Sequence, residues 1–404
     1  REYPWSSAAV PLDRNSLPRG LRSNTPITIE VKGVADHILG SMRDEVWADD
    51  IERRPFIHAS APSGIDLGGY RLGDSVGSRG VERVFEDSLR GTRGMAMERM
   101  ATGERTRVDS VPGKDLQLTI DIALQARIQA ILSPQFGLTR VEPWHNNVVL
   151  PMGTPLNSAA VVMEVETGEV LAMVSMPTIA MGQDMSDLER QVETPMVNRA
   201  AEATYPPGSI IKPFTLAAAV GEGLHNLDAP ITCNGKYFPN LETAGRCWIY
   251  REKFNMQTHG PLAADEALAR SCNIFFFTLA DRLGMERLIK WLDAFGMGHV
   301  LDVGLRYTTK TADGKEISVG EHAGSLPDKE LINTMRANGQ LKFGEVIMGI
   351  GQGPLTWTPL QAANAYATLA RGGSIRDATL VLHDPRGTRQ QRHDDLKISP
   401  KLVS

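Results

Sequence analysis

The sequence is informative first for what it lacks. No apolar stretch approaches the ~20 residues that span a bilayer, and no signal peptide stands at Arg1. Basic residues are not in excess, since 43 Lys and Arg face 48 Asp and Glu for a net charge of −5, so nucleic-acid binding has no support. Internal repeats and low-complexity tracts are absent. What remains is a globular composition, 42% hydrophobic and 23% charged, in a 404-residue chain long enough for two or three domains.

Cysteine is scarce, and its number is odd. Cys233, Cys247 and Cys272 are the three cysteines, so at least one of them has no disulfide partner within the chain. One interpretation is a disulfide between Cys233 and Cys247 with Cys272 buried and inert. The other adds His259, because three thiolates and one imidazole form a closed tetrahedral zinc site. The spacings are wider than those of a zinc finger, but zinc would use every cysteine and tie the 233–259 loop to the helix start near Cys272.

A serine and a lysine three residues apart stand where a Pro/Gly turn gives way to an apolar run. The turn Tyr205-Pro206-Pro207-Gly208 precedes Ser209, and Lys212 begins a predicted helix over 212–220 that Gly221 should end. Residues i and i+3 share a helix face, so the Lys212 amine can lie beside the Ser209 hydroxyl. A lysine whose pKa is lowered by burial can take the serine proton. Alone, the pair also fits a capping serine and a solvated lysine.

A second pair, Ser271 and Asn273, lies at the junction of two helical patterns. Ser-x-x-Lys and Ser-x-Asn are two of the three motifs shared by penicillin-binding proteins and serine β-lactamases. With both motifs, the chain resembles the class B penicillin-binding proteins over nearly its whole length, and is most similar to the cell-elongation type. Further stretches that resemble landmarks of the family, in the same order, are 80–85, 89–91, 115–121, 124–125, 167–174, 198–200, 349–353 and 358–361.

The resemblance implies a peptidoglycan D,D-transpeptidase that acts through a serine acyl-enzyme. Ser209, with Lys212 as base, would attack the D-Ala-D-Ala amide of a stem peptide, and an amine acceptor from a neighbouring strand would complete the cross-link. Ser271 would relay a proton to the leaving nitrogen, while Asn273 would hold the substrate amide and orient Lys212. The backbone N–H of Ser209 would form half of an oxyanion hole. No cofactor is implied for catalysis, and β-lactams are expected to acylate the same serine.

The resemblance also implies a setting. The expected partners are a membrane glycosyltransferase of the SEDS type and other elongation proteins, and the expected location is the periplasmic face of the bacterial inner membrane. Family members are anchored there by an N-terminal transmembrane helix, which this chain does not contain. For some elongation-type members, the resemblance further implies metal ligands in the loop that here carries His259.

The third family motif, a Lys-Thr-Gly on a strand well after Gly349-Ile350-Gly351-Gln352-Gly353, is missing, because the sequence stops at Ser404 before it. We therefore expect the native protein to be longer and the 404 residues alone to be impaired in turnover. The missing motif also supports an alternative from another class, a non-catalytic transpeptidase-like scaffold that binds cell-wall synthesis partners. The intact Ser209, Lys212, Ser271 and Asn273 favour the enzyme.

The predicted architecture is α+β in two domains. Residues 1–110 are polar and loop-rich, which by resemblance is a pedestal domain, and 111–404 form the transpeptidase domain. Asp121 should cap a helix, and 159–165 with 170–174 should form a hairpin at the centre of a buried sheet. Helices are also predicted over 262–269, 274–283, 285–295 and 360–373, with Gly284 and Gly296 as stops. The triplet Phe275-Phe276-Phe277 is interpreted as core.

Overall fold

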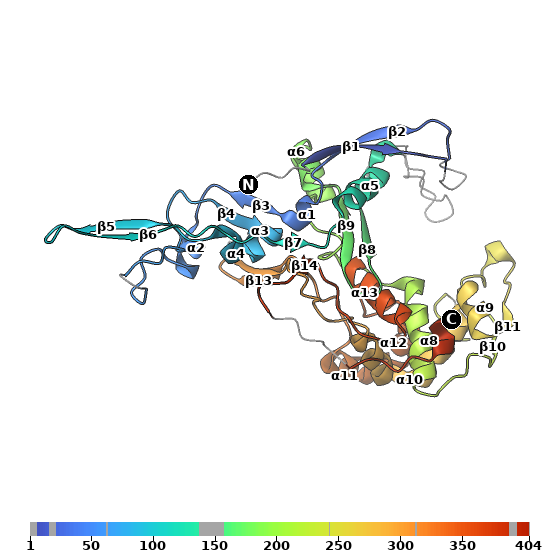
Figure 1. Ribbon diagram of the computed structural model, residues 1–404. Coiled ribbons are helices and arrows are strands. Elements are labelled where there is room, and N and C mark those ends of the chain that lie inside the picture. Colours follow the sequence, from blue (N-terminus) through green and yellow to red (C-terminus); the bar gives the residue numbers. More distant parts are fainter. Residues whose placement is uncertain are drawn as a thin grey trace.

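The computed structural model describes residues 6–15, 22–61, 64–136, 157–241, 243–311, 313–387 and 394–403 (Figure 1). Helices and antiparallel strand pairs are both present, and this mixture confirms the α+β class. The outer ends of the two predicted domains, residues 1 and 404, lie outside the described residues. Within the described residues, no helix combines the length and the apolar character that crossing a bilayer requires.

The N-terminal part consists of short elements. These are β1 (Ser7–Leu12), β2 (Ile27–Lys32), α1 (Asp36–Leu39), β3 (Ser41–Arg43), α2 (Ala48–Arg53), β4 (Val76–Arg79), α3 (Gly80–Val84), α4 (Glu86–Arg90), β5 (Met95–Arg99) and β6 (Glu104–Val108). The strands pair antiparallel as β1–β2, β3–β4 and β5–β6, and the β5–β6 ribbon extends away from the body (Figure 1). The sequence suggested irregular loops here, because ribbon strands such as β6 are exposed along their whole length and carry no alternating apolar pattern.

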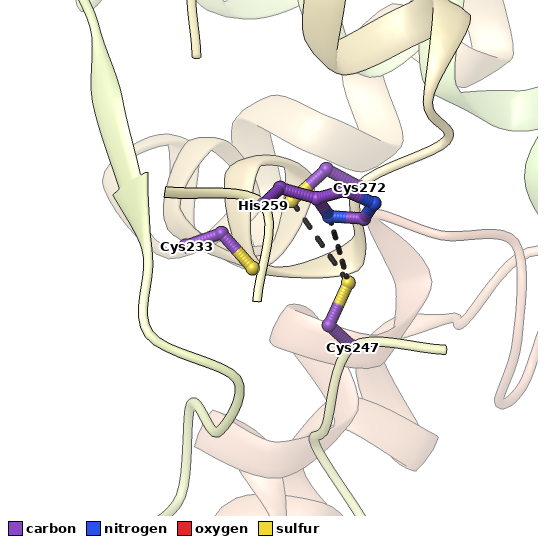
Figure 2. Close-up of side chains that lie close together, drawn as sticks. All are labelled: Cys233, Cys247, His259 and Cys272. Carbon is purple, nitrogen blue, oxygen red and sulfur yellow. Dashed lines mark hydrogen bonds between the residues drawn. The ribbon is translucent and has the colours of Figure 1, made fainter. Parts of the chain in front are cut away.

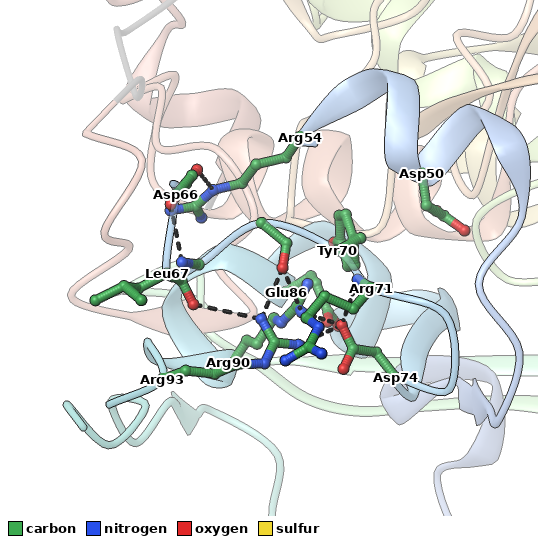
Figure 3. A network of polar contacts seen from close by, with 12 residues as sticks. Asp50, Arg54, Asp66, Leu67, Tyr70, Arg71, Asp74, Glu86, Arg90 and Arg93 are labelled. Carbon is green, nitrogen blue, oxygen red and sulfur yellow. Dashed lines mark hydrogen bonds and ion pairs between the residues drawn. The ribbon is translucent and has the colours of Figure 1, made fainter. Parts of the chain in front are cut away.

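Ion pairs hold the loops around α2 and α4 together (Figure 3). Asp50 is fully buried, and its carboxylate accepts hydrogen bonds from the guanidinium groups of Arg43 and Arg83. Burial opposes ionisation of Asp50, but the Trp47 N–H and the Arg83 side chain outweigh it and lower its pKa. Close by, Arg54 pairs with Asp66, and Asp74 accepts from both Arg90 and Arg93. Among the described residues, the local apolar cluster has three buried members, Val46, Tyr70 and Val76, so the ion pairs add to a small core here.

Helix α5 (Ile122–Leu132) joins the N-terminal hairpin to the rest of the molecule. Asp121 caps it as predicted, since the carboxylate accepts hydrogen bonds from the backbone of Ala123 and Leu124, each at 3.0 Å. Ala126 and Ala130 of α5 lie in one buried cluster with Ile29 of β2. The same helix also packs on β9, where the Gln125 side chain donates to the Met173 carbonyl at 2.9 Å. The β1–β2 hairpin therefore packs against a helix from beyond the N-terminal part.

The remaining elements, in chain order, are β7 (Gln117–Leu118), η2 (Pro134–Phe136), β8 (Ser158–Met163), β9 (Val170–Met176), α6 (Ile179–Gln183), α7 (Asp187–Glu193), η3 (Gly208–Ile211), α8 (Lys212–Gly221), β10 (Ile231–Cys233), η4 (Glu252–Phe254), β11 (Gly260–Leu262), α9 (Ala264–Ala269), α10 (Asn273–Ala294), β12 (Tyr307–Lys310), β13 (Glu316–Val319), α11 (Lys329–Ala337), α12 (Leu341–Met348), α13 (Pro359–Ala370), β14 (Val381–Leu382) and α14 (Pro400–Val403). The symbol η marks a 3-10 turn.

The predicted hairpin is present, but not the larger sheet around it. Strands β8 and β9 pair antiparallel from Ser158–Met176 to Met163–Val170. Among the described residues, every sheet has two strands, and Thr379 adds only an isolated parallel bridge to Glu169. Helix α13 packs on β8 and helix α5 on β9, and β9 is mostly buried. The prediction of a central position in a wider sheet was wrong for the described residues, because helix packing also produces the apolar runs from which it was inferred.

The main core surrounds α10. Phe275, Phe276 and Phe277 are at most 2% exposed, which confirms the interpretation of the triplet as core. Gly284 interrupts α10 at φ 71°, at the predicted stop. Two predicted helix boundaries were wrong. The helix expected over 262–269 begins at Ala264, because 260–262 form strand β11 and pair with β10. The helix expected over 360–373 ends at Ala370, with Arg371 as its C-cap.

Candidate active site

The turn that carries Ser209 is held by backbone contacts to a distant segment. Residues 208–211 form the 3-10 turn η3, and α8 follows directly from Lys212 with a proline in its first turn. The N–H of Gly208 donates to the carbonyl of Gly351 at 2.8 Å. Tyr205 and Trp357 exchange two backbone hydrogen bonds, at 2.9 and 3.1 Å. The turn is therefore fixed by tertiary contacts on its N-terminal side.

The four predicted catalytic residues lie together. The Lys212 Nζ donates to the Ser271 carbonyl at 2.8 Å, to Ser271 Oγ at 2.9 Å and to Asn273 Oδ1 at 2.9 Å. Ser271 Oγ in turn donates to Ser209 Oγ at 3.1 Å. The expected proximity of amine and nucleophile is thus realised through Ser271, whose hydroxyl bridges the two. Asn273 contacts Lys212, the position expected of a group that orients the amine.

The environment of Lys212 lowers the pKa of its amine. The residue is 1% exposed, and burial lowers its pKa from 10.5 to about 8, although the negative charge of Cys247 and Cys272 acts in the opposite direction. The amine lies 5.5 Å from the centre of the Phe276 ring. A lysine with a pKa near 8 is neutral in an appreciable fraction of molecules at neutral pH, as a general base must be.

The junction between α9 and α10 positions Ser271 and Asn273. Ser271 has a φ of 49°, in the left-handed region that residues other than glycine seldom adopt. The chain turns here, and α10 begins at Asn273. The Asn273 Nδ2 donates to the carbonyl of Arg246 at 3.2 Å. Between these two residues, Cys272 is fully buried, and its Sγ lies among the sulfur and nitrogen atoms of a Cys/His cluster.

The four predicted metal ligands form one cluster behind that junction (Figure 2). The ligand atoms of Cys233, Cys247, His259 and Cys272 lie within 4.8 Å of one another. The Sγ atoms of Cys247 and Cys272 are 4.0 Å apart, and Cys247 Sγ is 3.4 Å from His259 Nδ1. Zinc–sulfur bonds of ~2.3 Å in a tetrahedron place two sulfurs ~3.8 Å apart, so the donor set fits zinc. All three cysteines are free thiols, and the alternative disulfide between Cys233 and Cys247 is not formed.

The cluster brings together separate segments. Cys233 comes from β10, His259 precedes β11, and Cys247 lies in the loop between these paired strands. Hydrogen bonding with Cys233 and Cys272 lowers the pKa of Cys247, so one thiol of the cluster favours the thiolate that metals bind. The cysteines are buried and the imidazole is half-buried, as in a closed structural site.

One feature of the site was missed from sequence. The Gly349–Gly353 stretch was noted as a landmark but given no role, whereas Gly351 accepts the hydrogen bond that holds the nucleophile turn. Its positive φ of 74° requires glycine, and a repeated glycine pattern was the available signal.

Comparisons with known proteins agree with this geometry. Residues 158–403 match the family model described as "Penicillin binding protein transpeptidase domain", and residues 30–118 match "Penicillin-binding Protein dimerisation domain". The peptidoglycan D,D-transpeptidase MrdA of Escherichia coli (strain K12) is 28% identical over 340 residues, covering 80% of this chain and 47% of the relative. Penicillin-binding protein PbpB of Mycolicibacterium smegmatis is 28% identical over 413 residues, covering 97% of this chain and 55% of the relative. The chain spans about half the length of these curated relatives.

Solved structures share the fold. PBP2 of Pseudomonas aeruginosa, crystallised with WCK 5153, aligns with a TM-score of 0.66 at 24% identity over 93% of this chain and 72% of that one. PBP2 of Helicobacter pylori in complex with MreC aligns with a TM-score of 0.65 at 20% identity over 94% of this chain and 63% of that one.

Proposed function

Because the chain belongs to the penicillin-binding protein transpeptidase family, we propose that it is a class B peptidoglycan D,D-transpeptidase of the cell-elongation type. The observation that carries the proposal is the hydrogen-bonded series from Lys212 through Ser271 to Ser209. A buried amine of lowered pKa, one hydroxyl away from an exposed serine, is the arrangement that nucleophilic catalysis needs. The scaffold alternative is not favoured, since the relatives are themselves named D,D-transpeptidases.

In the proposed reaction, neutral Lys212 takes a proton from Ser271 as Ser271 takes one from Ser209. The Ser209 oxygen attacks the carbonyl of the penultimate D-alanine. The oxyanion of the tetrahedral intermediate accepts a hydrogen bond from the Ser209 backbone N–H. The same proton path, run in reverse, delivers a proton to the leaving nitrogen of the terminal D-alanine. An amine acceptor from a second stem peptide then attacks the ester and regenerates Ser209. Asn273 orients the Lys212 amine throughout.

Three further statements belong to the same proposal. Residues 1–110 act as a pedestal and 111–404 as the catalytic domain, which the two family matches support in outline. The protein works at the periplasmic face of the inner membrane with a SEDS-type glycosyltransferase and other elongation proteins, and the MreC complex of the H. pylori relative supports an elongation partner. A structural zinc at Cys233, Cys247, His259 and Cys272 stabilises the loop behind Ser271.

Labelling with a fluorescent penicillin tests the enzyme proposal. Full-length protein is incubated with the probe and run on a denaturing gel, with Ser209→Ala as the matched variant. A covalent band in the native protein that is lost in Ser209→Ala, at an unchanged melting temperature, is the expected result. No band in the native protein would reject the proposal, and a band that fades within seconds would indicate a β-lactamase.

A further inference from the structure

One side chain supports the nucleophile turn from a distant helix. Tyr366, on α13, is 38% exposed, yet its hydroxyl donates to the carbonyl of Ile210 at 2.8 Å. Ile210 directly follows Ser209 in the 3-10 turn. The carbonyl that accepts this hydrogen bond belongs to the Ile210–Ile211 peptide, the second peptide beyond the nucleophile.

The same ring has a second contact on the other side of Lys212. It meets Phe214 edge to face, with ring centres 5.0 Å apart and planes at 82°. Phe214 is fully buried and also packs edge to face against Phe295 and Trp357. Ile210 and Phe214 stand two residues before and two residues after Lys212, so Tyr366 brackets the first helical turn of the catalytic segment.

The other supports of this turn act on different residues. Gly351 accepts from Gly208, before the nucleophile, and the Thr215 hydroxyl donates to the Gly349 carbonyl at 3.1 Å, beyond Phe214. The Tyr366 hydroxyl acts between these two supports, on the Ile210 carbonyl. A small rotation there would move Ser209 Oγ relative to Ser271 Oγ, which lies at 3.1 Å, near the long end of the range for a hydroxyl–hydroxyl hydrogen bond.

We propose that Tyr366 is a positioning residue for acylation: its hydroxyl fixes the Ile210 peptide and so keeps Ser209 in line with Ser271 and Lys212. This inference rests on the proposed function. A neutral hydrogen bond of this kind is worth enough that its loss should slow acylation about three- to tenfold. Since Tyr366 lies outside the hydrogen-bonded series itself, its loss should leave the noncovalent affinity for the β-lactam unchanged.

Tyr366→Phe tests the proposal, because phenylalanine keeps the ring against Phe214 and removes only the hydroxyl. Stopped-flow acylation of the full-length protein separates the noncovalent dissociation constant from the acylation rate constant. The expected result is an acylation rate constant about three- to tenfold lower, with the dissociation constant and melting temperature as in wild type. Tyr307→Phe is the matched control, since Tyr307 lies on β12, an element that takes no part in the nucleophile turn. An unchanged acylation rate constant in Tyr366→Phe overturns the inference, as does an equal loss in both variants.

A second measurement makes the inference testable even if the proposed function fails. Hydrogen–deuterium exchange of the peptide that covers residues 208–216 reports the order of the turn directly. Faster exchange in Tyr366→Phe than in Tyr307→Phe supports the positioning role, and equal exchange contradicts it. A wild-type protein that is not acylated at all rejects the proposed function alone, while the exchange result still decides the role of Tyr366.

Discussion

Gly351 lies directly against Gly208, and the two backbones leave no room for a side chain between them. A Cβ atom on Gly351 would stand 2.2 Å from the Gly208 carbonyl oxygen, and Gly351 has a φ of 74°. Since Gly208 immediately precedes Ser209, this close approach fixes the position of the Ser209 backbone. The distance between two glycines is thus part of the geometry of the proposed active site.

Gly351→Ala should therefore reduce acylation more than it reduces stability. The methyl group forces the backbone of 208 or 351 to move, and Ser209 Oγ moves with it. We expect at least about a tenfold lower acylation rate, because misplacement by ~1 Å can cost more than that. Gly314→Ala, at a glycine of positive φ with no atom within 4 Å of the added Cβ, controls for backbone strain alone. Equal activity of Gly351→Ala and Gly314→Ala would contradict the prediction.

Acylation should depend on pH through Lys212. Below a pKa of about 8 the amine is protonated and cannot accept the serine proton, so the rate should rise about tenfold per pH unit and level off above pH 8. Stopped-flow acylation between pH 5.5 and 9.5 measures the midpoint. A profile that is flat between pH 6 and pH 9 would show that Lys212 is not the base.

Asn273→Asp should move that midpoint upward. The Asn273 Oδ1 lies 2.9 Å from the Lys212 amine, so a carboxylate in its place would stabilise the ammonium and raise the lysine pKa by roughly one unit or more. The acylation rate at pH 7 should fall accordingly and recover at higher pH. Asn273→Ala is the control: it should lower the rate without an upward shift of the midpoint. A midpoint of Asn273→Asp at or below that of wild type would argue against direct coupling of the two side chains.

Protein purified without chelator should contain about one zinc per chain, as a single closed four-ligand site predicts. Cys247→Ser should lose most of this zinc. It should also melt at a lower temperature, because the zinc no longer links the loop behind Ser271 to the rest of the cluster. Elemental analysis and thermal unfolding measure both, with His58→Gln, an exposed histidine outside the cluster, as control. Mass-spectrometric detection of a Cys233–Cys247 disulfide in the native protein would instead establish the alternative.

Two leucines of opposite burial test the core. Leu279 on α10 is fully buried, and Leu279→Ala should lower the free energy of unfolding by about 2–5 kcal/mol. Leu188 on α7 is 71% exposed, and Leu188→Ala should change the free energy of unfolding by less than about 0.5 kcal/mol. Urea unfolding followed by tryptophan fluorescence measures both. Similar effects of the two substitutions would mean that α10 is not the centre of the core.

The sequence predicted the elements whose signals are local. Asp121 predicted the start of α5, and Gly284 predicted the break in α10. Both predictions were possible because helix capping and backbone conformation depend on only a few neighbouring residues. Ser209, Lys212, Ser271 and Asn273 could be proposed as catalytic residues because short motifs carry them. The order in which these side chains contact one another could not be predicted. Ser271 lies between Lys212 and Ser209 because of how α8 packs beside α10, and no local sequence pattern encodes that packing. Gly351 and Tyr366 were missed as site residues for the same reason.

The long reach of these contacts has a consequence for synthesis. Gly351 and Tyr366 follow Ser209 by about 150 residues, and at roughly 5–20 residues per second a ribosome needs on the order of ten seconds or more to make them. Until then the serine, its lysine and even Asn273 can exist in the growing chain without the supports that align them. A nascent or prematurely terminated chain should therefore be inert toward β-lactams while it already contains every residue of the hydrogen-bonded series.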